Sequence, residues 1–210
     1  MDRLIGLWTS STLLKGGVLV ALFYWAWFSF TADSRERNIL LITLISTPVI
    51  VLIARLLALN LPFRARPIHD ENLNFTLPTG ISENAQEGMT CFPSDHAVLY
   101  FSLAVGILLV SKRLGLVAIL YTLIFIGLPR IYVGFHYPTD ILGGFLIGGA
   151  LILISIYLFA NSIITTRIND WTEKQPGAFY ALFFLTTFQI ANLFNESRQI
   201  ARLLFSSLAY

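Results

Sequence analysis

The chain has 210 residues, of which 56% are hydrophobic and only 12% charged, and its mean hydropathy is +0.72. A soluble domain carries about 25% charged residues, so this composition argues against a soluble protein and favours one surrounded by lipid. The formal net charge is +2 and no run of Lys or Arg is present, so we expect no nucleic-acid partner. The single cysteine, Cys91, leaves no intrachain disulfide to predict.

Apolar residues gather in blocks, and a block of about 20 residues is what a helix needs to cross the hydrocarbon core of a bilayer. In chain order the predicted membrane helices cover residues 13–31, 39–59, 96–110, 114–128, 141–160 and 178–194. The sixth contains two polar residues, Gln189 and Asn192. No Ala-x-Ala site follows the first block, which we therefore interpret as an anchor helix and not as a cleaved signal peptide. The expected fold class is an all-α integral membrane protein, with one domain over residues 1–210 built as a bundle of about six transmembrane helices.

One long polar segment, residues 60–93, separates the second and third predicted helices. It contains prolines and glycines at intervals that rule out a long regular helix, namely Pro62, Pro67, Pro78, Gly80 and Gly88. Because successive membrane helices alternate in direction, this loop lies on the same side of the membrane as the short loop after the fourth helix, residues 129–139. We therefore expect the two loops to contribute to one site.

Positive charge is distributed unevenly between the two sides of the predicted bundle. The connections opposite the two loops carry six positive residues without evident chemistry: Arg35, Arg37, Lys112, Arg113, Arg167 and Lys174. The side of the two loops carries four outside its motifs: Arg3, Lys15, Arg198 and Arg202. On the positive-inside rule the first side is cytoplasmic, so the site and both termini are expected to face the periplasm or an equivalent exterior compartment.

All three histidines of the chain, His69, His96 and His136, lie in or beside the two loops. Arg64 and Arg66 precede the first of them. Planar guanidinium groups match the geometry of phosphate oxygens and keep their charge at physiological pH, so this pair indicates an anion site. The alternative is that both arginines only reach towards lipid headgroups.

Ser94 stands directly before the third predicted helix, where it has the character of an N-cap residue. Unpaired backbone N–H groups and the positive end of a helix form a site for phosphate. His96 follows one or two residues inside that site. The alternative is a plain serine cap with an incidental histidine.

Arg130, His136 and Asp140 follow the fourth predicted helix. A helix that begins near Pro138 would place the Asp140 carboxylate within reach of the His136 imidazole. Such a pair has the properties of a nucleophile and its orienting group, because the carboxylate fixes the tautomer that leaves one ring nitrogen free to attack phosphorus. A metal site is the rival interpretation, but three arginines on the same side supply the positive charge themselves, so we predict no metal.

In this order and spacing, the three clusters resemble the signature of the type 2 phosphatidic acid phosphatase superfamily over residues 55–144. That family includes membrane lipid phosphatases and is related to the vanadium haloperoxidases. The matching elements are Arg66-Pro67, Pro93-Ser94-Asp95-His96 and Arg130…His136…Asp140. Three positions depart from the family's pattern, where Leu59 replaces a lysine, Asp95 a glycine and Pro129 a serine.

The Pro-Ser-Asp-His variant without the lysine looks like the bacterial undecaprenyl-diphosphate phosphatases associated with bacitracin resistance. This likeness implies a polyprenyl diphosphate as the favoured substrate and a bacterial plasma membrane as the location. Arg64 or Arg55 would then supply the cation that is missing at Leu59. Asp95 would either hold an arginine or tune the proton on His96, and the role of His69 stays open.

The family's roles imply that His136 is the nucleophile, Asp140 its orienting partner and His96 the general acid that protonates the leaving oxygen. The phosphoryl oxygens would be held by Arg66, Arg130 and Ser94, with Arg64 as a further phosphate-binding residue. No cofactor is implied, and the expected partners are a lipid phosphate substrate and membrane lipids. Alternatives are a phosphatidic acid or phosphatidylglycerol phosphate phosphatase, a lipid phosphotransferase, and a non-catalytic lipid-phosphate binder or transporter.

Overall fold

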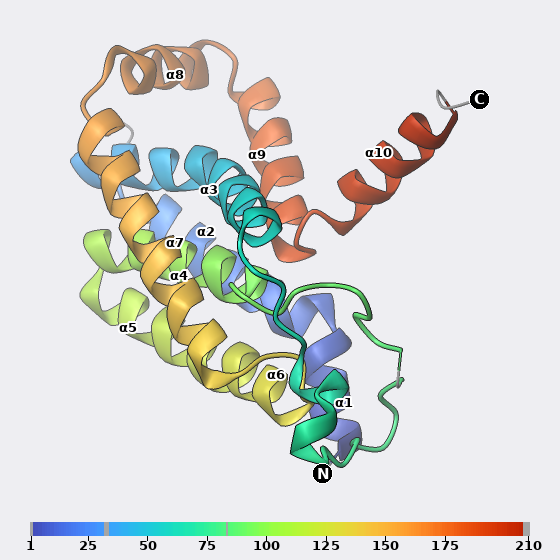
Figure 1. The fold of residues 1–210 in the computed structure, drawn as a ribbon. Helices are drawn as coiled ribbons and strands as arrows, with labels where there is room; N and C mark the ends of the chain where they lie inside the picture. The colour runs from blue at the N-terminus through green and yellow to red at the C-terminus, as the bar shows by residue number, and fades with distance from the viewer. Residues whose placement is uncertain (1, 32–33, 83, 208–210) are drawn as a thin grey trace.

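A computed structural model describes residues 2–31, 34–82 and 84–207, and every regular element in these ranges is a helix (Figure 1). The α-helices are α1 (Asp2–Ser10), α2 (Val18–Phe28), α3 (Arg35–Asn60), α4 (Asp95–Val110), α5 (Lys112–Tyr121), α6 (Leu128–Tyr132), α7 (Pro138–Phe159), α8 (Ile163–Lys174), α9 (Pro176–Ala191) and α10 (Asn195–Ser207). Two π-helical turns, η1 (Leu13–Gly17) and η4 (Thr122–Gly127), lead into α2 and α6. Two 3-10 turns, η2 (Pro67–His69) and η3 (Glu71–Leu73), lie in the long loop.

Each of the six predicted apolar segments coincides with a helix. Three helical segments are long and apolar enough to cross a membrane: Arg35–Asn60 with 26 residues, Lys112–Tyr132 with 21 and Pro138–Phe159 with 22. The other three, Leu13–Phe28, Asp95–Val110 and Pro176–Ala191, are shorter apolar helices. The helical class is therefore confirmed for the described residues, whereas the number of six crossings stays a prediction.

Helix α4 forms the centre of the bundle and contacts α2, α3, α5 and α7. Its residues 97–107 are all buried. The close packing of α7 against it depends on Gly144 and Gly148, because a Cβ atom at Gly148 would overlap the backbone of Val98. Small residues four apart allow two helices to approach closely in this way. The contact brings the start of α4 next to the start of α7, where the predicted site residues lie.

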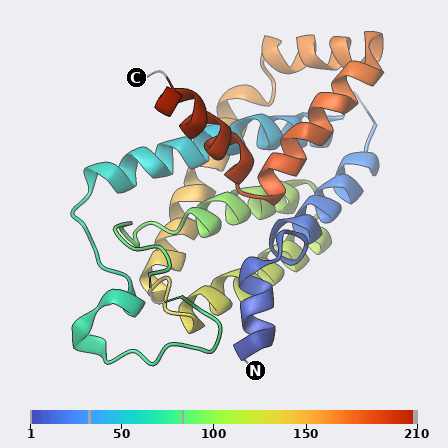
Figure 2. The ribbon, with the colours of Figure 1, turned by 90° about the vertical axis from the view of Figure 1, so that its right-hand side faces the viewer.

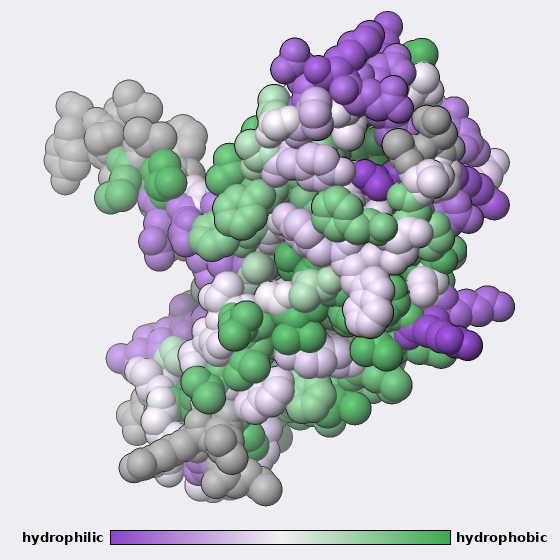
Figure 3. Space-filling view, turned by 180° about the vertical axis from the view of Figure 1, so that it is seen from behind, coloured by the Kyte–Doolittle hydropathy of each residue, from purple (hydrophilic) through white to green (hydrophobic). Residues whose placement is uncertain are grey.

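The outward faces of the bundle carry many large apolar side chains. Examples on α3, α5, α7 and α9 are Leu52, Leu116, Leu146, Leu153 and Leu182, all of which are exposed. Figure 3 shows apolar residues across the middle of one face and a gathering of hydrophilic residues at its top. A soluble monomer rarely exposes apolar surface on this scale, so the composition of the surface is that of an integral membrane protein.

The long loop, residues 61–94, lies with α1 and α6 at one end of the bundle, and α8 crosses the opposite end (Figures 1 and 2). The loop is fixed to the turn before α7 because the N–H of Ile68 donates to the carbonyl of Gly134 at 3.0 Å. The N–H of Thr79 donates to the carboxylate of Asp2 at 3.1 Å, which attaches the loop to α1 as well. The two loops that we expected to meet therefore do so.

The second loop is shorter than predicted. We expected it to begin at residue 129, but α6 continues to Tyr132, so the connection to α7 consists of residues 133–137 only. Pro129 does not end the helix, because the π-helical turn η4 runs directly into α6 and the helical segment Lys112–Tyr132 is continuous through it. Arg130 consequently projects from a helix and not from a loop.

Candidate active site

His136 lies in the turn between α6 and α7, with 4% of its surface exposed. Its Nδ1 atom is 2.9 Å from the carbonyl oxygen of Cys91. A carbonyl only accepts, so Nδ1 carries the proton. The other ring nitrogen, Nε2, is 3.4 Å from Nη1 of Arg66, which only donates. The two neighbours together therefore select the tautomer in which Nε2 is unprotonated and its lone pair points towards Arg66.

The charge state of His136 agrees with that tautomer. Burial lowers the pKa of the imidazole from 6.5 to about 4, and the positive charges of Arg130 and Arg66 act in the same direction, while the nearby carboxylate of Asp140 opposes them. The ring is thus neutral near pH 7. A neutral imidazole with an unprotonated Nε2 is a competent nucleophile.

Asp140 is fully buried in the first turn of α7. Its Oδ2 atom accepts the N–H of Tyr137 at 2.8 Å and lies 3.7 Å from Nδ1 of His136. Its Oδ1 atom is 2.8 Å from Nη1 of Arg64. As expected, α7 begins at Pro138 and Asp140 lies in its first turn. The N–H of Tyr137 and the guanidinium of Arg64 hold the carboxylate in position.

Arg66 is buried beside the imidazole of His136. Its guanidinium donates to three backbone carbonyls, those of Met89 at 3.2 Å, Phe135 at 2.7 Å and Thr90 at 3.2 Å. Burial lowers the pKa of the group below its ordinary value. These contacts fix the guanidinium before any ligand binds, and such preorganised donors stabilise charge that develops on a phosphoryl group.

Arg130 and His96 contact each other directly, and both line the cavity that contains His136 in its wall. Nη2 of Arg130 is 2.5 Å from Nε2 of His96. Arg130 comes from α6 and is buried, whereas His96 lies in the first turn of α4. A guanidinium only donates, so this nitrogen of His96 is unprotonated in the ligand-free state.

Ser94 occupies the N-cap position of α4 by its backbone conformation, but its side chain makes no capping hydrogen bond. The hydroxyl is buried and has no hydrogen-bond partner among the described residues. Its backbone N–H donates to the carbonyl of Asp140 at 3.3 Å, which joins the starts of α4 and α7.

Of the predicted phosphate-binding residues, Arg66 and Arg130 line the cavity and Ser94 does not. Arg64 lies apart from Arg66 and Arg130. Its Nη1 atom donates to Asp140 and to Oγ1 of Thr139 at 3.0 Å, and its guanidinium stacks on the ring of Tyr137 at 4.1 Å. Of the residues that the structure describes, it is not among those lining the cavity. His69 is also outside the cavity, and its Nε2 atom lies 3.0 Å from the carbonyl of Ala85 within the long loop.

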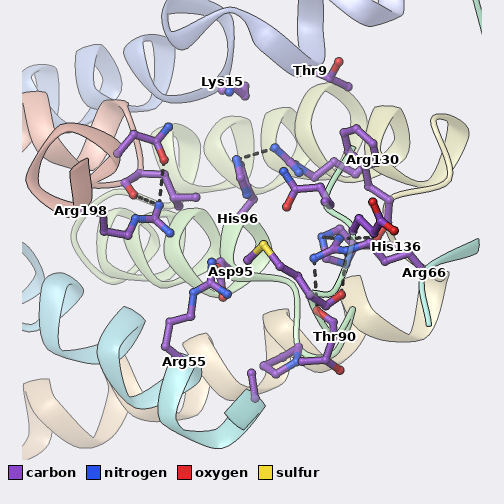
Figure 4. Close-up of a pocket in the computed structure, with 18 of the residues that line it drawn as sticks. Thr9, Lys15, Arg55, Arg66, Thr90, Asp95, His96, Arg130, His136 and Arg198 are labelled. Carbon is purple, nitrogen blue, oxygen red and sulfur yellow. Dashed lines mark hydrogen bonds and ion pairs between the residues drawn. The ribbon is translucent and has the colours of Figure 1, made fainter. Parts of the chain in front are cut away.

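The cavity has a volume of about 500 Å³ and contains His96 and His136 in its wall (Figure 4). Five cationic side chains line it: Lys15, Arg55, Arg66, Arg130 and Arg198. Among the described residues, two carboxylates line it as well, those of Asp95 and Glu87. The excess of positive charge fits an anionic ligand. In the part of the chain that the structure describes, no group of three or more His, Cys, Asp or Glu residues is placed to hold a metal ion.

A known family matches this part of the chain. Residues 59–164, a stretch that covers half of the chain, match the family model of the PAP2 superfamily. The chain belongs to the PAP2 superfamily. The predicted resemblance is thereby confirmed, and the PAP2 match includes His96, His136 and every matching element of the signature.

Among the curated relatives of this PAP2 chain, one is named a transport permease and others are named lipid phosphatases. It is 37% identical over 68 residues to the bacitracin transport permease protein BcrC of Bacillus licheniformis, covering 32% of each chain. It is 29% identical over 85 residues to an undecaprenyl-diphosphatase of Sulfolobus acidocaldarius, covering 40% of this chain and 41% of that one. It is 31% identical over 98 residues to the lipid A 1-phosphatase of Rhizobium etli, covering 47% and 41%. The chain thus spans between about a third and two fifths of the length of these relatives, and no solved structure matches it.

Two departures from the PAP2 signature, at Leu59 and Asp95, are connected through Arg55. Leu59 replaces the lysine and is 79% exposed, but Arg55, one helical turn earlier in α3, lines the cavity. Nη2 of Arg55 is 2.6 Å from Oδ2 of Asp95, which stands where the signature has glycine. Asp95 therefore holds an arginine, the first of the two roles considered for it.

Three of the five cations in the cavity lie outside every motif: Lys15, Arg55 and Arg198. From the sequence, Lys15 and Arg198 were predicted only as charges on the side of the site, together with Arg3 and Arg202, whose side chains lie outside the described residues. Their positions within or beside apolar segments were the signal that could have identified them as cavity residues, because a cation in such a position usually faces a polar interior.

Proposed function

We propose that this chain is a membrane lipid phosphatase that cleaves a lipid phosphate or diphosphate through a phosphohistidine on Nε2 of His136. The observation that carries the proposal is the fixed tautomer of His136, whose Nδ1 donates to the carbonyl of Cys91 while Nε2 faces a cationic cavity. A site that only binds phosphate has no need of an aligned nucleophile. A polyprenyl diphosphate is the favoured substrate because the relative from Sulfolobus acidocaldarius carries the name undecaprenyl-diphosphatase.

In the first step the phosphoryl group lies between Arg66 and Arg130, whose guanidinium groups donate to its oxygens. Nε2 of His136 forms a bond to phosphorus as the bond from phosphorus to the leaving oxygen breaks. His96 gives its proton to that oxygen. The carbonyl of Cys91 and the carboxylate of Asp140 stabilise the positive charge that develops on the imidazole.

In the second step His96 takes a proton from water, and the water oxygen attacks phosphorus as the P–N bond breaks. Phosphate leaves and His136 returns to its neutral form. Ser94 is assigned to this site as a phosphate-binding residue because its buried hydroxyl has no partner among the described residues. Arg64 is assigned a supporting role at Asp140.

The proposed arrangement in the membrane has six crossings in a single domain, with the cavity and both termini on the exterior side of a bacterial plasma membrane. The cavity opens at the end of the bundle that carries the long loop, whereas Lys112 and Lys174 lie at connections assigned to the other side. A lipid headgroup would then reach the cavity while its tail stays among the exposed apolar side chains of the helices.

The test is phosphate release by the purified protein in detergent with EDTA, from undecaprenyl diphosphate, phosphatidic acid and phosphatidylglycerol phosphate. The His136→Ala variant removes the nucleophile, and His69→Gln is the matched control because it changes a histidine outside the cavity. We expect release by the wild type and by His69→Gln, and none by His136→Ala. Binding of the lipids without release of phosphate by the wild type would support a binder or transporter instead.

A further inference from the structure

The cavity extends beyond the residues of the PAP2 signature. In Figure 4, Arg66 and His136 lie on one side of His96, whereas Arg55 and Arg198 lie on the other and Lys15 lies above. All of them line the same cavity. His96 thus separates two groups of cations, of which only the first is assigned to the phosphoryl group that is transferred.

Lys15 is a half-buried cation in need of an anionic partner. It lies in the π-helical turn η1, and π turns within helices occur frequently at functional sites. Among the described residues no carboxylate lies within 4.0 Å of its amino group. The positive charge of Arg130 instead acts on Lys15. A bound anion would relieve the repulsion between these two cations.

Arg198 lines the same cavity as Lys15 because the two ends of the chain pack together. Gly16, next to Lys15, lies so close to the backbone of Ala191 that a Cβ atom there would overlap it. The chain then turns, and the guanidinium of Arg198 donates to the carbonyl of Leu193 and to Oδ1 of Asn195, the latter at 3.0 Å. These contacts hold Arg198 near His96, on which its charge acts.

Arg55 completes this group from α3. Its ion pair with Asp95 at 2.6 Å holds the guanidinium beside the first turn of α4, where His96 follows directly. Asp95 thereby neutralises the charge of Arg55, whereas no carboxylate among the described residues lies within 4.0 Å of Lys15.

We propose, resting on the phosphatase function above, that Lys15, Arg55 and Arg198 form a second anion subsite for the phosphate that remains on the lipid when a diphosphate is cleaved. His96 protonates the leaving oxygen. The group bonded to that oxygen therefore lies beyond His96, on the side away from His136. In a lipid diphosphate that group is the second phosphate. The substrate class is therefore a lipid diphosphate, and the subsite distinguishes it from a lipid monophosphate.

The covalent step then proceeds as follows for a diphosphate. Nε2 of His136 bonds to the terminal phosphorus, and the bond from that phosphorus to the bridging oxygen breaks. The electron pair stays with the bridging oxygen, which becomes part of the leaving lipid monophosphate and takes the proton of His96. The subsite stabilises the negative charge that accumulates on this leaving group.

The experiment compares kcat/KM for farnesyl diphosphate and farnesyl phosphate, which share one tail and differ by one phosphate. For Lys15→Gln we expect the loss on the diphosphate to exceed the loss on the monophosphate about tenfold, as for one hydrogen bond to a charged group. Arg198→Gln should shift the ratio in the same direction, and Lys15→Arg should restore it. Lys112→Gln, an exposed lysine at the start of α5, is the matched control and should leave the ratio unchanged.

Equal losses on both substrates in Lys15→Gln and Arg198→Gln, or no loss in either, would overturn the subsite. Inorganic phosphate that competes as well as inorganic diphosphate would also overturn it, since the cations would then bind free phosphate. If the wild type hydrolyses neither lipid, the phosphatase function fails separately. Stabilisation against heat by inorganic diphosphate but not by phosphate, lost in Lys15→Gln, would in that case still support the subsite.

Discussion

The guanidinium of Arg130 donates to Nε2 of His96, the same nitrogen that must carry a proton if His96 acts as the general acid. The two requirements are compatible only if the substrate changes the contact. A phosphoryl group between Arg66 and Arg130 offers charged oxygens as better acceptors than a neutral imidazole. We therefore expect substrate binding to draw Arg130 away and leave Nε2 of His96 free to take up a proton.

The role of His96 is best tested by changing both the residue and the leaving group. An alkoxide is a far poorer leaving group than a phosphate, so proton donation matters more for a lipid monophosphate than for a diphosphate. For His96→Gln we expect kcat on farnesyl phosphate to fall by about 10²- to 10⁴-fold. The fall on farnesyl diphosphate should be at least about ten times smaller. Equal falls on the two substrates would argue that His96 holds the site together and does not donate a proton.

Arg64 and Arg66 are predicted to differ in kinetic effect although they are two residues apart. Arg66 lies beside Nε2 of His136, so Arg66→Gln should lower kcat/KM strongly and raise KM. Arg64 contacts Asp140 and not the cavity, so Arg64→Gln should lower kcat by about 10- to 100-fold with little change in KM, because it misplaces the carboxylate. Steady-state kinetics on one lipid substrate measure the difference. A large rise of KM in Arg64→Gln would instead place its guanidinium on the substrate.

The packing of α7 on α4 predicts a difference between two neighbouring glycines. A Cβ atom at Gly148 would overlap the backbone of Val98, whereas one at Gly149 would meet only Cγ2 of Val105 at 4.0 Å. Gly148→Ala should therefore cost about 1–3 kcal/mol of stability through overpacking. Gly149→Ala is the control and should cost much less. Thermal unfolding of the two variants in the same detergent compares them, and similar midpoints would show that the helices move apart freely at this contact.

Much of the site follows from local sequence. The alternation of helix direction placed His96 and His136 on one side, and Pro138 fixed the start of α7 and with it the position of Asp140. These relations depend on short stretches of chain, which is why a sequence pattern can predict them.

The partners of the charged side chains could not be predicted in the same way. Arg64 and Arg66 are equally suited to phosphate by type, and only the packing of the loop decides that Arg64 faces Asp140. Lys15 and Arg198 meet at the cavity because Gly16 packs against the end of α9, a contact between residues at opposite ends of the chain. Long-range packing of this kind leaves no local pattern.

The buried imidazole of His136 predicts how stability depends on pH. Burial lowers its pKa from 6.5 to about 4, so between these values the unfolded chain binds a proton that the folded chain does not. The free energy of unfolding therefore falls as the pH is lowered from about 7 to about 4, with a contribution from this residue of up to about 3 kcal/mol. Thermal unfolding of the wild type and of His136→Asn at several pH values in this range measures that contribution. The variant should lose less stability than the wild type on acidification, because an amide takes up no proton on unfolding, and equal losses would mean that His136 does not carry the effect.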